Sequence, residues 1–578
     1  MTTISTIEAR CKDCYKCLRS CPVKAIRFVE GATKSELHAK VMSERCILDG
    51  RCVLECPQKA KRVRSDLQRV RNLIDEGRTL IASLAPSYVG AFFPDRQGRV
   101  VAALRELGFY RVEETAFGAE LVTAAHLATL DGGGASLPVI TSACPVVVNL
   151  VEMYYPELIP HMAPVVSPML AHAMYLKAQY PKAAVVFVGP CFAKKDEGTK
   201  SGVVDAVLTF RELLEWAQSE GISMESLSES EPDGKLGRIA TLFPADGGLL
   251  KTASMPTDIL AEEVTVVSGV DNCQAFLQRL KDSPESANSL RMVEMLACQG
   301  GCIFGPGLVG CGDPALRRRA LLSYYRARAE NPRCASREDV TLALASLDLR
   351  RGYADRKPDT LVPDEVTIRA ILAQTGKFSP EDELNCGACG YSSCREKATA
   401  VYHGFAEIQM CMPYMRDRAE SMSNVIIASI PNAVIVVGKD LTIVEMNRAA
   451  EQMFGVSPMK LSGQALSTLI DPSNFEKVLE TRKLLKVRVA YPQYGLVTEQ
   501  SIFYVDKENV VVGVFEDVTH EERRKEEVAR LKQSAVQRAQ EVINKQMKVA
   551  QEVAGLLGET TADTKVLLTR LIELMQKD

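Results

Sequence analysis

The sequence predicts a multidomain protein in which α+β and α/β domains follow one another along the chain. The chain has 578 residues, and at roughly 150 residues per domain this is room for about three to five domains with their own cores. Its 18 cysteines fall into separate groups, most of them with metal-ligand spacing. Between these groups, apolar runs alternate with helical stretches, which is typical of parallel strands in α/β layers.

The composition is that of an ordinary globular protein. A net charge of −3 with 25% charged residues leaves no basic excess for nucleic acid. No stretch approaches the ~20 apolar residues of a membrane span, and the N-terminus lacks an apolar signal region. We therefore expect a cytoplasmic protein with no nucleic acid and no membrane as a partner. In that reducing compartment most of the cysteines should bind metal, and Cys273, Cys311 and Cys334, which fit no ligand pattern, should be core thiols.

Residues 1–75 contain two cysteine runs, C-x2-C-x2-C-x3-C-P and C-x5-C-x3-C-P. This is the spacing of bacterial ferredoxins, in which three closely spaced thiolates hold one 4Fe-4S cluster and a fourth crosses to the other. The resulting ligand sets are Cys11, Cys14, Cys17 and Cys56 for one cluster, and Cys21, Cys46 and Cys52 for the second. We therefore expect a ferredoxin-like domain with two clusters. A zinc ribbon is the alternative, which the interleaved spacing disfavours.

Asp49 stands where the second run would be expected to carry a further cysteine. A carboxylate is a harder ligand than a thiolate and binds iron in a sulfur cluster less firmly. The iron at this corner is therefore expected to be labile, bound by aspartate or absent, and its absence would give a three-iron cluster.

The polarity of the segments after the first cysteine runs predicts their secondary structure. The Arg/Lys-rich segment 59–77 is predicted as a solvated connecting helix. The apolar run at 79–93 is predicted as a buried strand that Pro86 stops, and the runs at 137–143, 183–190 and 203–210 are predicted as parallel strands. Ligands of parallel sheets lie beyond the carboxyl ends of the strands. Cys144 and Cys191 each directly follow such a run, so the strand prediction puts both at this edge.

Four cysteines in three short segments form the candidate centre of the chain. Cys144 lies in TSACP, Cys191 in GPCFAKKDE, and Cys298 with Cys302 in EMLACQGGCIFGPG. Glycines beside them allow the backbone to approach a bulky inorganic group, and Lys194 offers a cation beside the thiolates. The alternative is four unrelated buried thiols, since free cysteine is often a small core residue.

These three motifs, in this order, resemble the active-site domain of the iron-only hydrogenases. The resemblance covers roughly residues 76–350 and implies a two-lobed α/β hydrogenase domain, here bounded at 76–355. It implies an H-cluster, which is a 4Fe-4S cluster on the four cysteines joined through Cys302 to a two-iron unit with CO, cyanide and a dithiolate. It also implies that Lys194 faces a cyanide with Glu197 as its support. The further cofactor-facing segment implied is Ala85, Pro86 and Ser87.

Several positions depart from the catalytic members of that family. The residue before the first ligand is in those members a cysteine that shuttles the proton, and here it is Ala143, whose methyl group cannot carry one. Loss of a positioned acid or base commonly costs about 10²–10⁴-fold in rate. The pattern therefore resembles the sensory, PAS-containing type and predicts slow turnover. Further substituted positions are Gly189 and Leu296 in place of methionines, Met169 in place of a glutamine, and Ala125 and His126 in place of an acidic pair.

His126 is the tempting substitute base among these. A single histidine at the end of an apolar stretch is more often a satisfied core residue, and we interpret it in that way.

A third cysteine group has the spacing C-x2-C-x4-C-x16-C. It resembles the small 4Fe-4S domain of electron-transfer and corrinoid proteins, which implies a small helical domain at 356–420 with one cluster. The ligands are Cys386, Cys389, Cys394 and Cys411. Zinc is the alternative metal.

Residues 421–520 alternate strands with turns and a helix. The motifs Pro431-Asn432-Ala433, Asn447 and Asp517-Val518-Thr519 resemble those of a PAS domain, and nothing among them marks a haem or flavin ligand. The resemblance implies dimerisation and transmission of strain to the helices that follow.

Residues 521–578 are predicted as signalling or dimerisation helices. The first, about 521–557, has apolar residues every seven positions, but Arg538 and Lys545 intrude, so its coiled coil is modest. Gly558 should end it, and Thr560 or Thr561 should cap a second helix. The repeating apolar positions are Val528, Ala535, Val542, Val549 and Leu556.

Three functions remain open from the sequence. The first is an H₂-responsive redox sensor that forms a homodimer and signals to a kinase or phosphatase-type partner. The second is a slow catalytic hydrogenase that exchanges electrons with ferredoxin or another redox donor. The third is a non-catalytic iron–sulfur protein without the diiron unit, like the eukaryotic cluster-assembly relatives. H₂ turnover after maturation separates the first two, and infrared bands of CO and cyanide test the third.

Overall fold

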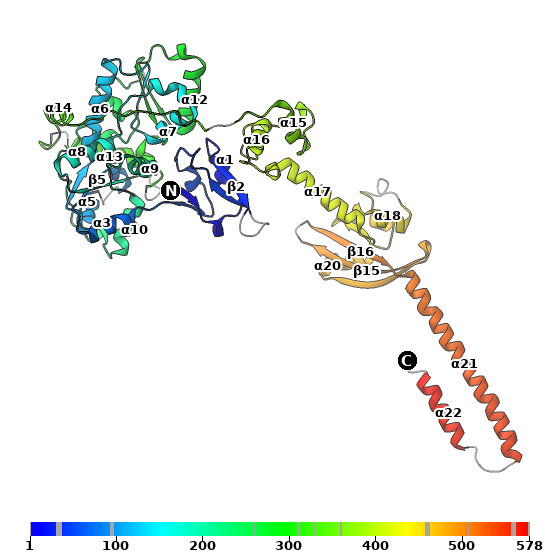
Figure 1. The fold of residues 1–578 in the computed structure, drawn as a ribbon. Helices are drawn as coiled ribbons and strands as arrows, with labels where there is room; N and C mark the ends of the chain where they lie inside the picture. The colour runs from blue at the N-terminus through cyan, green and yellow to red at the C-terminus, as the bar shows by residue number, and fades with distance from the viewer. Residues whose placement is uncertain are drawn as a thin grey trace. The chain divides into compact units, whose positions relative to one another are not determined.

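The computed structural model describes residues 2–30, 37–92, 97–258, 260–308, 313–328, 330–358, 361–456, 463–506, 508–556 and 562–575 (Figure 1). It forms two compact units, residues 1–414 and 415–578. The predicted mixture of α+β and α/β domains is confirmed, while the exact domain bounds stay predictions. None of the helices within these ranges is long and apolar enough to cross a bilayer.

The N-terminal cysteine runs are held by two small antiparallel sheets, β1 with β4 and β2 with β3. Two short helices carry Cys17 and Cys52 beside them. The elements are β1 (Ile4–Thr6), α1 (Lys16–Ser20), β2 (Ile26–Glu30), β3 (Leu37–Val41), α2 (Arg51–Leu54) and β4 (Lys61–Val63).

The prediction of one solvated helix over 59–77 is wrong for its first half. Lys61–Val63 is strand β4, and only α3 (Leu67–Asp75) is helical. Lys61 is buried in that strand, and its ammonium donates to Thr6 Oγ1 at 2.7 Å. The basic run therefore closes the first sheet, because its backbone pairs with the N-terminal strand.

The larger lobe of the α/β domain is built on a parallel four-stranded sheet of order β6-β5-β8-β9. Every residue of β5 and β8 is buried, as expected for apolar strands covered by helices. Helix α8 packs against β5 and β8, and α10 packs against β8 and β9. The strands are β5 (Leu80–Leu84), β6 (Arg111–Glu114), β8 (Ala184–Gly189) and β9 (Ala206–Thr209). The helices are α4 (Tyr88–Ala91), α5 (Gln97–Glu106), α6 (Ala116–Asp131), α8 (Pro168–Gln179), α9 (Ala193–Ser201) and α10 (Phe210–Ser219).

The smaller lobe is built on a parallel three-stranded sheet of order β10-β11-β7. Its hydrophobic core is continuous with that of the N-terminal domain, because Val147 and Val293 share one buried cluster with Leu18 and Ile47. The strands are β7 (Val139–Ile140), β10 (Val264–Ser268) and β11 (Met292–Leu296), and the helices are α7 (Pro145–Tyr154), α11 (Gly248–Thr252) and α12 (Val270–Asp282).

The charged segment 349–358 packs across the α/β domain without forming a helix or strand. It follows α13 (Pro314–Arg328) and α14 (Arg337–Ala345). Tyr353 donates to Ala163 O at 2.6 Å, and Arg356 pairs with Glu152 at 2.8 Å. These contacts fasten the segment to the lobe that carries α7.

The third cysteine group lies in a small helical module formed by α15 (Glu365–Ala373), α16 (Cys394–Tyr402) and the start of α17 (Met412–Ser429). Tyr391 belongs to the same buried cluster as the N-terminal domain, and the Arg45 guanidinium lies 5.0 Å from the centre of the Phe405 ring. The module therefore packs directly on the ferredoxin-like domain.

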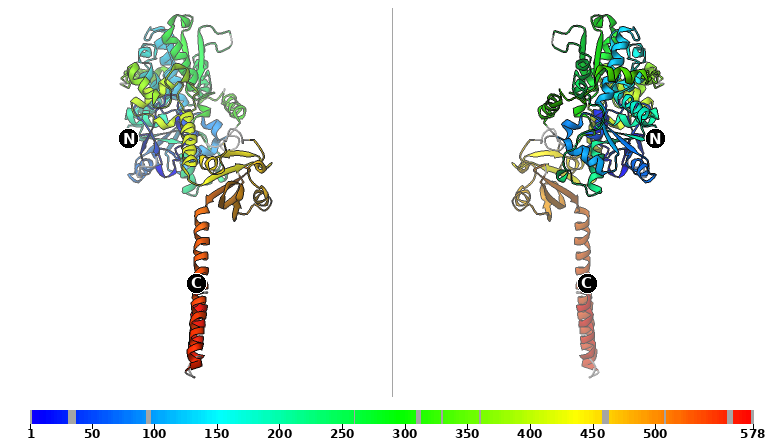
Figure 2. Two further views of the ribbon diagram at one scale, coloured as in Figure 1. Left: turned by 90° about the vertical axis from the view of Figure 1, so that its right-hand side faces the viewer. Right: turned by 90° about the vertical axis from the view of Figure 1, so that its left-hand side faces the viewer.

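The second unit begins within α17 and contains one antiparallel five-stranded sheet of order β13-β12-β16-β15-β14 (Figure 2). Its interior is filled by aromatic side chains, among them Phe454, Phe475 and Phe515. Asn447 caps α18 and donates to the Asn432 carbonyl at 3.0 Å, which ties two predicted PAS motifs together. The elements are β12 (Ala433–Val437), β13 (Ile443–Met446), α18 (Arg448–Phe454), α20 (Ser473–Thr481), β14 (Leu485–Tyr491), β15 (Leu496–Val505) and β16 (Val510–Asp517).

Two long helices follow the sheet, α21 (Thr519–Leu556) and α22 (Ala562–Met575), and they lie side by side (Figure 2). The predicted helix boundary at Gly558 and the caps at Thr560 or Thr561 lie outside the described residues. On α21 the side chains of Val528, Val542 and Val549 are exposed, so an apolar stripe is left uncovered within this unit.

Candidate metal centres

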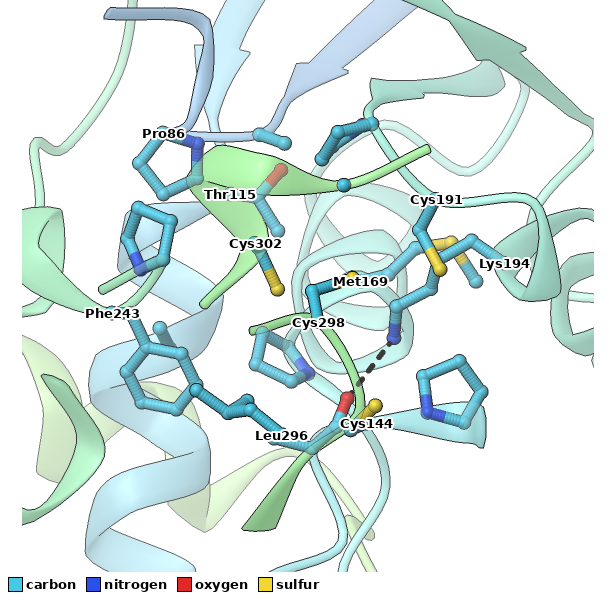
Figure 3. A pocket seen from close by; sticks show the side chains of 18 of the residues that line it. Pro86, Thr115, Cys144, Met169, Cys191, Lys194, Phe243, Leu296, Cys298 and Cys302 are labelled. Carbon is cyan, nitrogen blue, oxygen red and sulfur yellow. Dashed lines mark hydrogen bonds between the residues drawn. The ribbon is translucent and has the colours of Figure 1, made fainter. Parts of the chain in front are cut away.

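A cavity of about 100 Å³ lies at the carboxyl ends of the two parallel sheets (Figure 3). Cys191, Cys144 and Cys298 come shortly after the ends of β8, β7 and β11. Cys302 reaches the same cavity from the next turn. The structure thus brings together four cysteines that are up to 158 positions apart in the sequence.

The four thiols are poorly suited to remain as isolated groups. Burial raises the pKa of Cys191 to about 11 and raises the pKa values of Cys298 and Cys302 further, and the neighbouring thiols add to each rise. Lys194 opposes the rise at Cys191 and Cys302. Buried thiolates are stable when a metal neutralises them, so this donor set fits an iron–sulfur cluster.

Lys194 is held in place by a buried carboxylate. Its ammonium donates to Glu197 Oε2 at 2.8 Å and to the Ala143 carbonyl at 3.3 Å (Figure 3). Glu197 also accepts from Ser167 Oγ at 3.0 Å and, through its other oxygen, from Arg351 at 3.0 Å. Glu197 therefore fixes the direction of Lys194 without lining the cavity itself.

Arg351 is a residue that sequence reasoning missed. It lies in the charged segment 349–358, more than 150 positions after Glu197, and its own motif carries no sign of the pairing. Only the folding of that segment across the lobe brings the two side chains together.

The predicted cofactor-facing residues divide into two groups. Ala85, Pro86, Met169 and Leu296 line the cavity. Ser87 lies behind this wall, and its buried hydroxyl has no hydrogen-bond partner among the described residues, which fits a group held beside it.

Gly189 is also set back from the cavity wall, because other side chains occupy the space beside it. A Cβ at this position would lie 2.6 Å from the Phe187 ring and 3.0 Å from Ala85 Cβ. Phe187 itself lines the cavity. A larger residue at 189 would therefore have to displace Phe187, a partner that the sequence did not suggest.

The cavity offers almost no group that could exchange a proton. Apart from the cysteines, Lys194 and Thr115 are the polar side chains among its described lining residues. Lys194 is paired with Glu197, and Thr115 Oγ1 is engaged with Ser83 Oγ at 2.8 Å. Ala143 occupies the wall next to Cys144 with a methyl group.

His126 is a core residue, as interpreted from the sequence. Its Nδ1 lies 2.8 Å from the Val122 carbonyl, and its Nε2 accepts from the N–H of Ser142 at 3.3 Å. Burial lowers the pKa of His126 to about 4, so it stays neutral at ordinary pH. It is not one of the described residues that line the cavity.

The N-terminal thiols fall into the two groups expected from their spacing. Burial raises the pKa of Cys17, and the nearby Cys11, Cys14 and Cys56 raise it further. Burial likewise raises the pKa of Cys52 well above its ordinary value, with Cys46, Asp49 and Cys21 adding to the rise. Each set therefore shares one electrostatic neighbourhood, as a cluster site requires.

Asp49 lies with the second group and faces the hydrogenase-like domain. Its buried Oδ2 accepts no hydrogen bond within the described chain, and Arg51 Nε lies 3.8 Å away. Burial raises the pKa of Asp49 to about 6. The next residue, Gly50, packs so closely that a Cβ there would lie 2.7 Å from the ring of Phe192, which follows Cys191. A carboxylate oxygen that accepts no hydrogen bond from the described residues fits an iron corner at this place.

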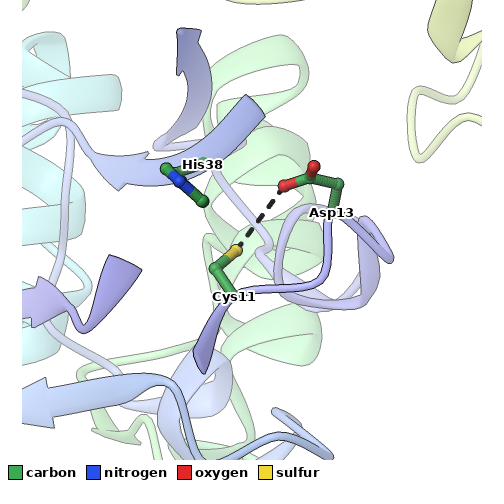
Figure 4. A group of neighbouring side chains, drawn as sticks. All are labelled: Cys11, Asp13 and His38. Carbon is green, nitrogen blue, oxygen red and sulfur yellow. Dashed lines mark hydrogen bonds between the residues drawn. The ribbon is translucent and has the colours of Figure 1, made fainter. Parts of the chain in front are cut away.

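A further group of possible ligands stands beside the first cluster site (Figure 4). Cys11 Sγ lies 3.8 Å from Asp13 Oδ1, and an imidazole nitrogen of His38 lies within 4.8 Å of both. Cys11 is already assigned to the first cluster. Asp13 and His38 therefore flank that cluster site, and neither was singled out from the sequence.

The third cysteine group surrounds a small pocket of its own, lined by all four of its thiols. Gly387 and Gly390 have φ values of +68° and +95°, which glycine adopts without strain, so the loop can wrap closely around a metal group. The side chain of Asn385 accepts from the N–H of Cys394 at 2.7 Å and holds the loop against α16.

Of the three unassigned cysteines, Cys273 is a core thiol as predicted, whereas the prediction is wrong for Cys334, which is only partly buried. Cys273 is buried with its sulfur 3.6 Å from the Leu296 carbonyl, and Cys334 Sγ lies 3.4 Å from the Arg328 carbonyl. Cys311 lies outside the described residues.

Comparison with known families accounts for much of the chain. Residues 78–306 match the family "Iron only hydrogenase large subunit, C-terminal domain". Residues 10–60 match a 4Fe-4S dicluster domain, residues 382–413 an Fe-S cluster family, and residues 422–487 the PAS fold.

Individual relatives match about half of the chain or less. Iron hydrogenase 1 of Clostridium pasteurianum is 26% identical over 53% of this chain and 64% of its own length, so the chain spans less than two thirds of that relative. The periplasmic [Fe] hydrogenase large subunit of Nitratidesulfovibrio vulgaris is 29% identical over 52% of this chain and 85% of its own. The cytosolic Fe-S cluster assembly factor NAR1 of Encephalitozoon cuniculi is 27% identical over 34% of this chain and 57% of its own.

Proposed function

We propose that the chain, whose residues 78–306 match the iron-only hydrogenase family, is an H₂-responsive redox sensor. It carries out slow, reversible H₂ oxidation and proton reduction, and it passes the resulting redox change to its PAS domain and C-terminal helices. Its eighteen cysteines favour a reducing, cytoplasmic setting.

The observation that carries this proposal is a cavity with metal ligands but no proton relay among its described lining residues. The four thiols and Lys194 line it, while Ala143 and other apolar side chains make up most of the rest. In this proposal Cys144, Cys191, Cys298 and Cys302 hold the 4Fe-4S part of an H-cluster, and Lys194 faces a cyanide of the diiron unit. When bound, that cofactor supplies the iron that splits H₂ into a hydride and a proton.

The protein's own residues then determine how slowly the proton leaves. A general acid or base must lie within hydrogen-bond reach of the proton that it transfers. Lys194 is committed to Glu197 at 2.8 Å, and Ala143 offers no exchangeable proton. Slow exchange with solvent suits detection of H₂ better than bulk gas metabolism.

Electron transfer to the output has a continuous set of candidate sites. The second N-terminal site abuts Phe192 beside Cys191, and the third cysteine module packs on the N-terminal domain. Cys411 immediately precedes α17, the helix that leads to the first strand of the PAS sheet. A homodimer formed by the PAS domain and helices, and a kinase or phosphatase-type partner, complete the proposal.

Two other functions remain candidates. A slow ferredoxin-linked hydrogenase would use the same cavity but would pass no signal to the PAS domain and the C-terminal helices. The similarity to NAR1 favours instead a non-catalytic iron–sulfur protein, since that relative is named a cluster assembly factor.

Hydrogen exchange separates the sensor from these alternatives. The protein loaded with all cofactors is placed under H₂ or under argon, and amide exchange is measured in α17 and the PAS strands. We expect exchange there to differ between the gases, and to be the same for a control that holds its 4Fe-4S clusters but no diiron unit. Equal exchange under both gases, in protein that does oxidise H₂, would contradict the sensor and favour the slow hydrogenase.

A further inference from the structure

Two buried lysines face the cysteines of the third metal site. Lys377 and Lys397 are only 8% and 6% exposed, and both line the pocket that the four thiols surround. Lys377 Nζ lies 3.4 Å from Cys411 Sγ. Lys397 Nζ is held within the module by the Ile408 carbonyl at 2.9 Å.

Neither lysine forms an ion pair in the described part of the chain, although Asp382 lies near enough to Lys377 to interact with it electrostatically. No acidic side chain in the described part of the chain lies within 4.0 Å of either ammonium group, and the other contacts of Lys377 are to the carbonyl and hydroxyl of Thr375 at 3.1 and 3.2 Å. Burying an unpaired ammonium group is costly unless a negative group compensates for it. A cluster held by four thiolates provides that compensation.

The N-terminal sites have a different charge balance. A single buried lysine, Lys61, lies near the thiols of both sites. The second of them also contains the carboxylate of Asp49, whose side chain is 9% exposed. Two buried lysines thus serve one site in the third module. The two N-terminal sites share one buried lysine, and the second of them also holds a carboxylate that Arg51 offsets from 3.8 Å.

We infer that Lys377 and Lys397 raise the reduction potential of the centre held by Cys386, Cys389, Cys394 and Cys411 above those of the N-terminal centres, which makes it the electron-collecting end of the chain. Adding an electron adds negative charge, and a nearby buried cation stabilises that charge strongly in a medium of low dielectric constant. The reduction potentials of such clusters follow net charge, hydrogen bonds to sulfur and exposure.

A role of this reduction potential in signalling rests on the proposed function. The order of the reduction potentials does not depend on that function. Oxidation of one H₂ releases two protons and two electrons, and each 4Fe-4S centre stores one of these electrons. A higher potential at the third site makes it the first to be filled. Cys411 is the last residue before α17, so the charge change occurs at the start of the helix that enters the second unit.

A redox titration of the full chain tests the inference. The 4Fe-4S clusters are reconstituted without the diiron unit, and the cluster signals are followed by electron paramagnetic resonance. We expect Lys377→Met and Lys397→Met each to shift the midpoint potential of the third centre to more negative values, with a larger shift in the double variant. Arg369→Met removes an exposed charge of the same module, paired with Glu365, and should leave the potential unchanged. An unchanged potential in a double variant with full iron content would overturn the inference.

The order of reduction in the unsubstituted protein is an independent test, which applies even if a methionine variant fails to hold its cluster. The signal that disappears in Cys386→Ala/Cys389→Ala should be the first to appear on stepwise reduction of the wild type. If that signal appears last, the inference is wrong. Because no diiron unit is present, a failure of the H₂ response would leave both results standing.

Discussion

Ala143 lies in the wall of the cavity beside Cys144, and its carbonyl accepts from Lys194 at 3.3 Å. The backbone of this residue therefore helps to position the cation, while its side chain contributes only a methyl group. A thiol at the same place would add a group that releases and regains a proton near neutral pH.

Ala143→Cys should consequently raise H₂ turnover by about 10²-fold or more, since a positioned acid or base commonly contributes that much. Turnover is measured after maturation in vitro, with infrared spectra to verify equal loading of the cofactor. Ala143→Ser serves as the control, because its hydroxyl is a much weaker acid at similar size. Equal rates for wild type and Ala143→Cys would point to the remaining relay positions as the deficit.

Arg351→Met should destabilise the support of Lys194. It removes a charged donor from the buried Glu197 Oε1, a loss that costs about 1–3 kcal/mol. We expect a lower melting temperature, with the cyanide bands shifted in loaded protein. Arg350→Met is the matched control, because the adjacent Arg350 pairs with Asp348 on the surface, where both side chains are more than half exposed. A melting temperature equal in the two variants would show that the Arg351 contact does not hold Glu197.

For individual residues, the sequence predicted the metal ligands better than the side chains that hold the site in place. The cysteines and Lys194 sit in short motifs with distinctive spacing, and the structure brings Cys144, Cys191, Cys298 and Cys302 to one cavity. Arg351 and Phe187 were not predicted, because a charge-pair partner or a space-filling ring is selected by tertiary contact and leaves no local pattern.

Apolar runs in the sequence predicted the buried strands correctly. The prediction was wrong where pairing with a distant strand decides the structure of a polar segment. Strands β5 and β8 are buried throughout, as the runs predicted. The basic segment that contains Lys61–Val63 forms a strand because β1 is available as its partner. Segment 349–358 has no regular structure, yet Arg351 and Arg356 are bound by Glu197 and Glu152, which lie far away in sequence.

The joint between the ferredoxin-like element and the active-site lobe depends on Gly50. Its φ is +81°, and a Cβ would lie 2.7 Å from the Phe192 ring and 3.0 Å from Pro306. Gly50→Ala should therefore lower the melting temperature, through backbone strain and overpacking of about 1–3 kcal/mol.

Gly77→Ala isolates the first of these causes, the backbone strain. Gly77 has a φ of +68° but no atom within 4 Å of the Cβ position, so this variant has the backbone strain without the clash. Differential scanning calorimetry should show the larger loss for Gly50→Ala. Equal losses would mean that the close approach to Phe192 does not matter for the joint.

For the whole molecule, the predicted homodimer depends on the second unit. Val542 is 59% exposed on α21, in line with Val528 and Val549 at seven-residue spacing, and α22 leaves this stripe uncovered. Val542→Glu should shift the protein from dimer to monomer, because a charge on the stripe opposes its burial. Light scattering after size-exclusion chromatography measures the mass. Gln540→Glu adds the same charge off the stripe and should leave the dimer intact, and a dimer retained by Val542→Glu would exclude the stripe as the interface.

The most direct test of the central claim is infrared spectroscopy of the matured protein, combined with its rate of H₂ turnover. The account predicts bands of bound CO and cyanide that change under H₂, together with turnover far below that of bulk hydrogenases. Absence of these bands, or turnover as fast as that of a bulk catalyst, would contradict a cavity that holds the diiron unit without a proton relay.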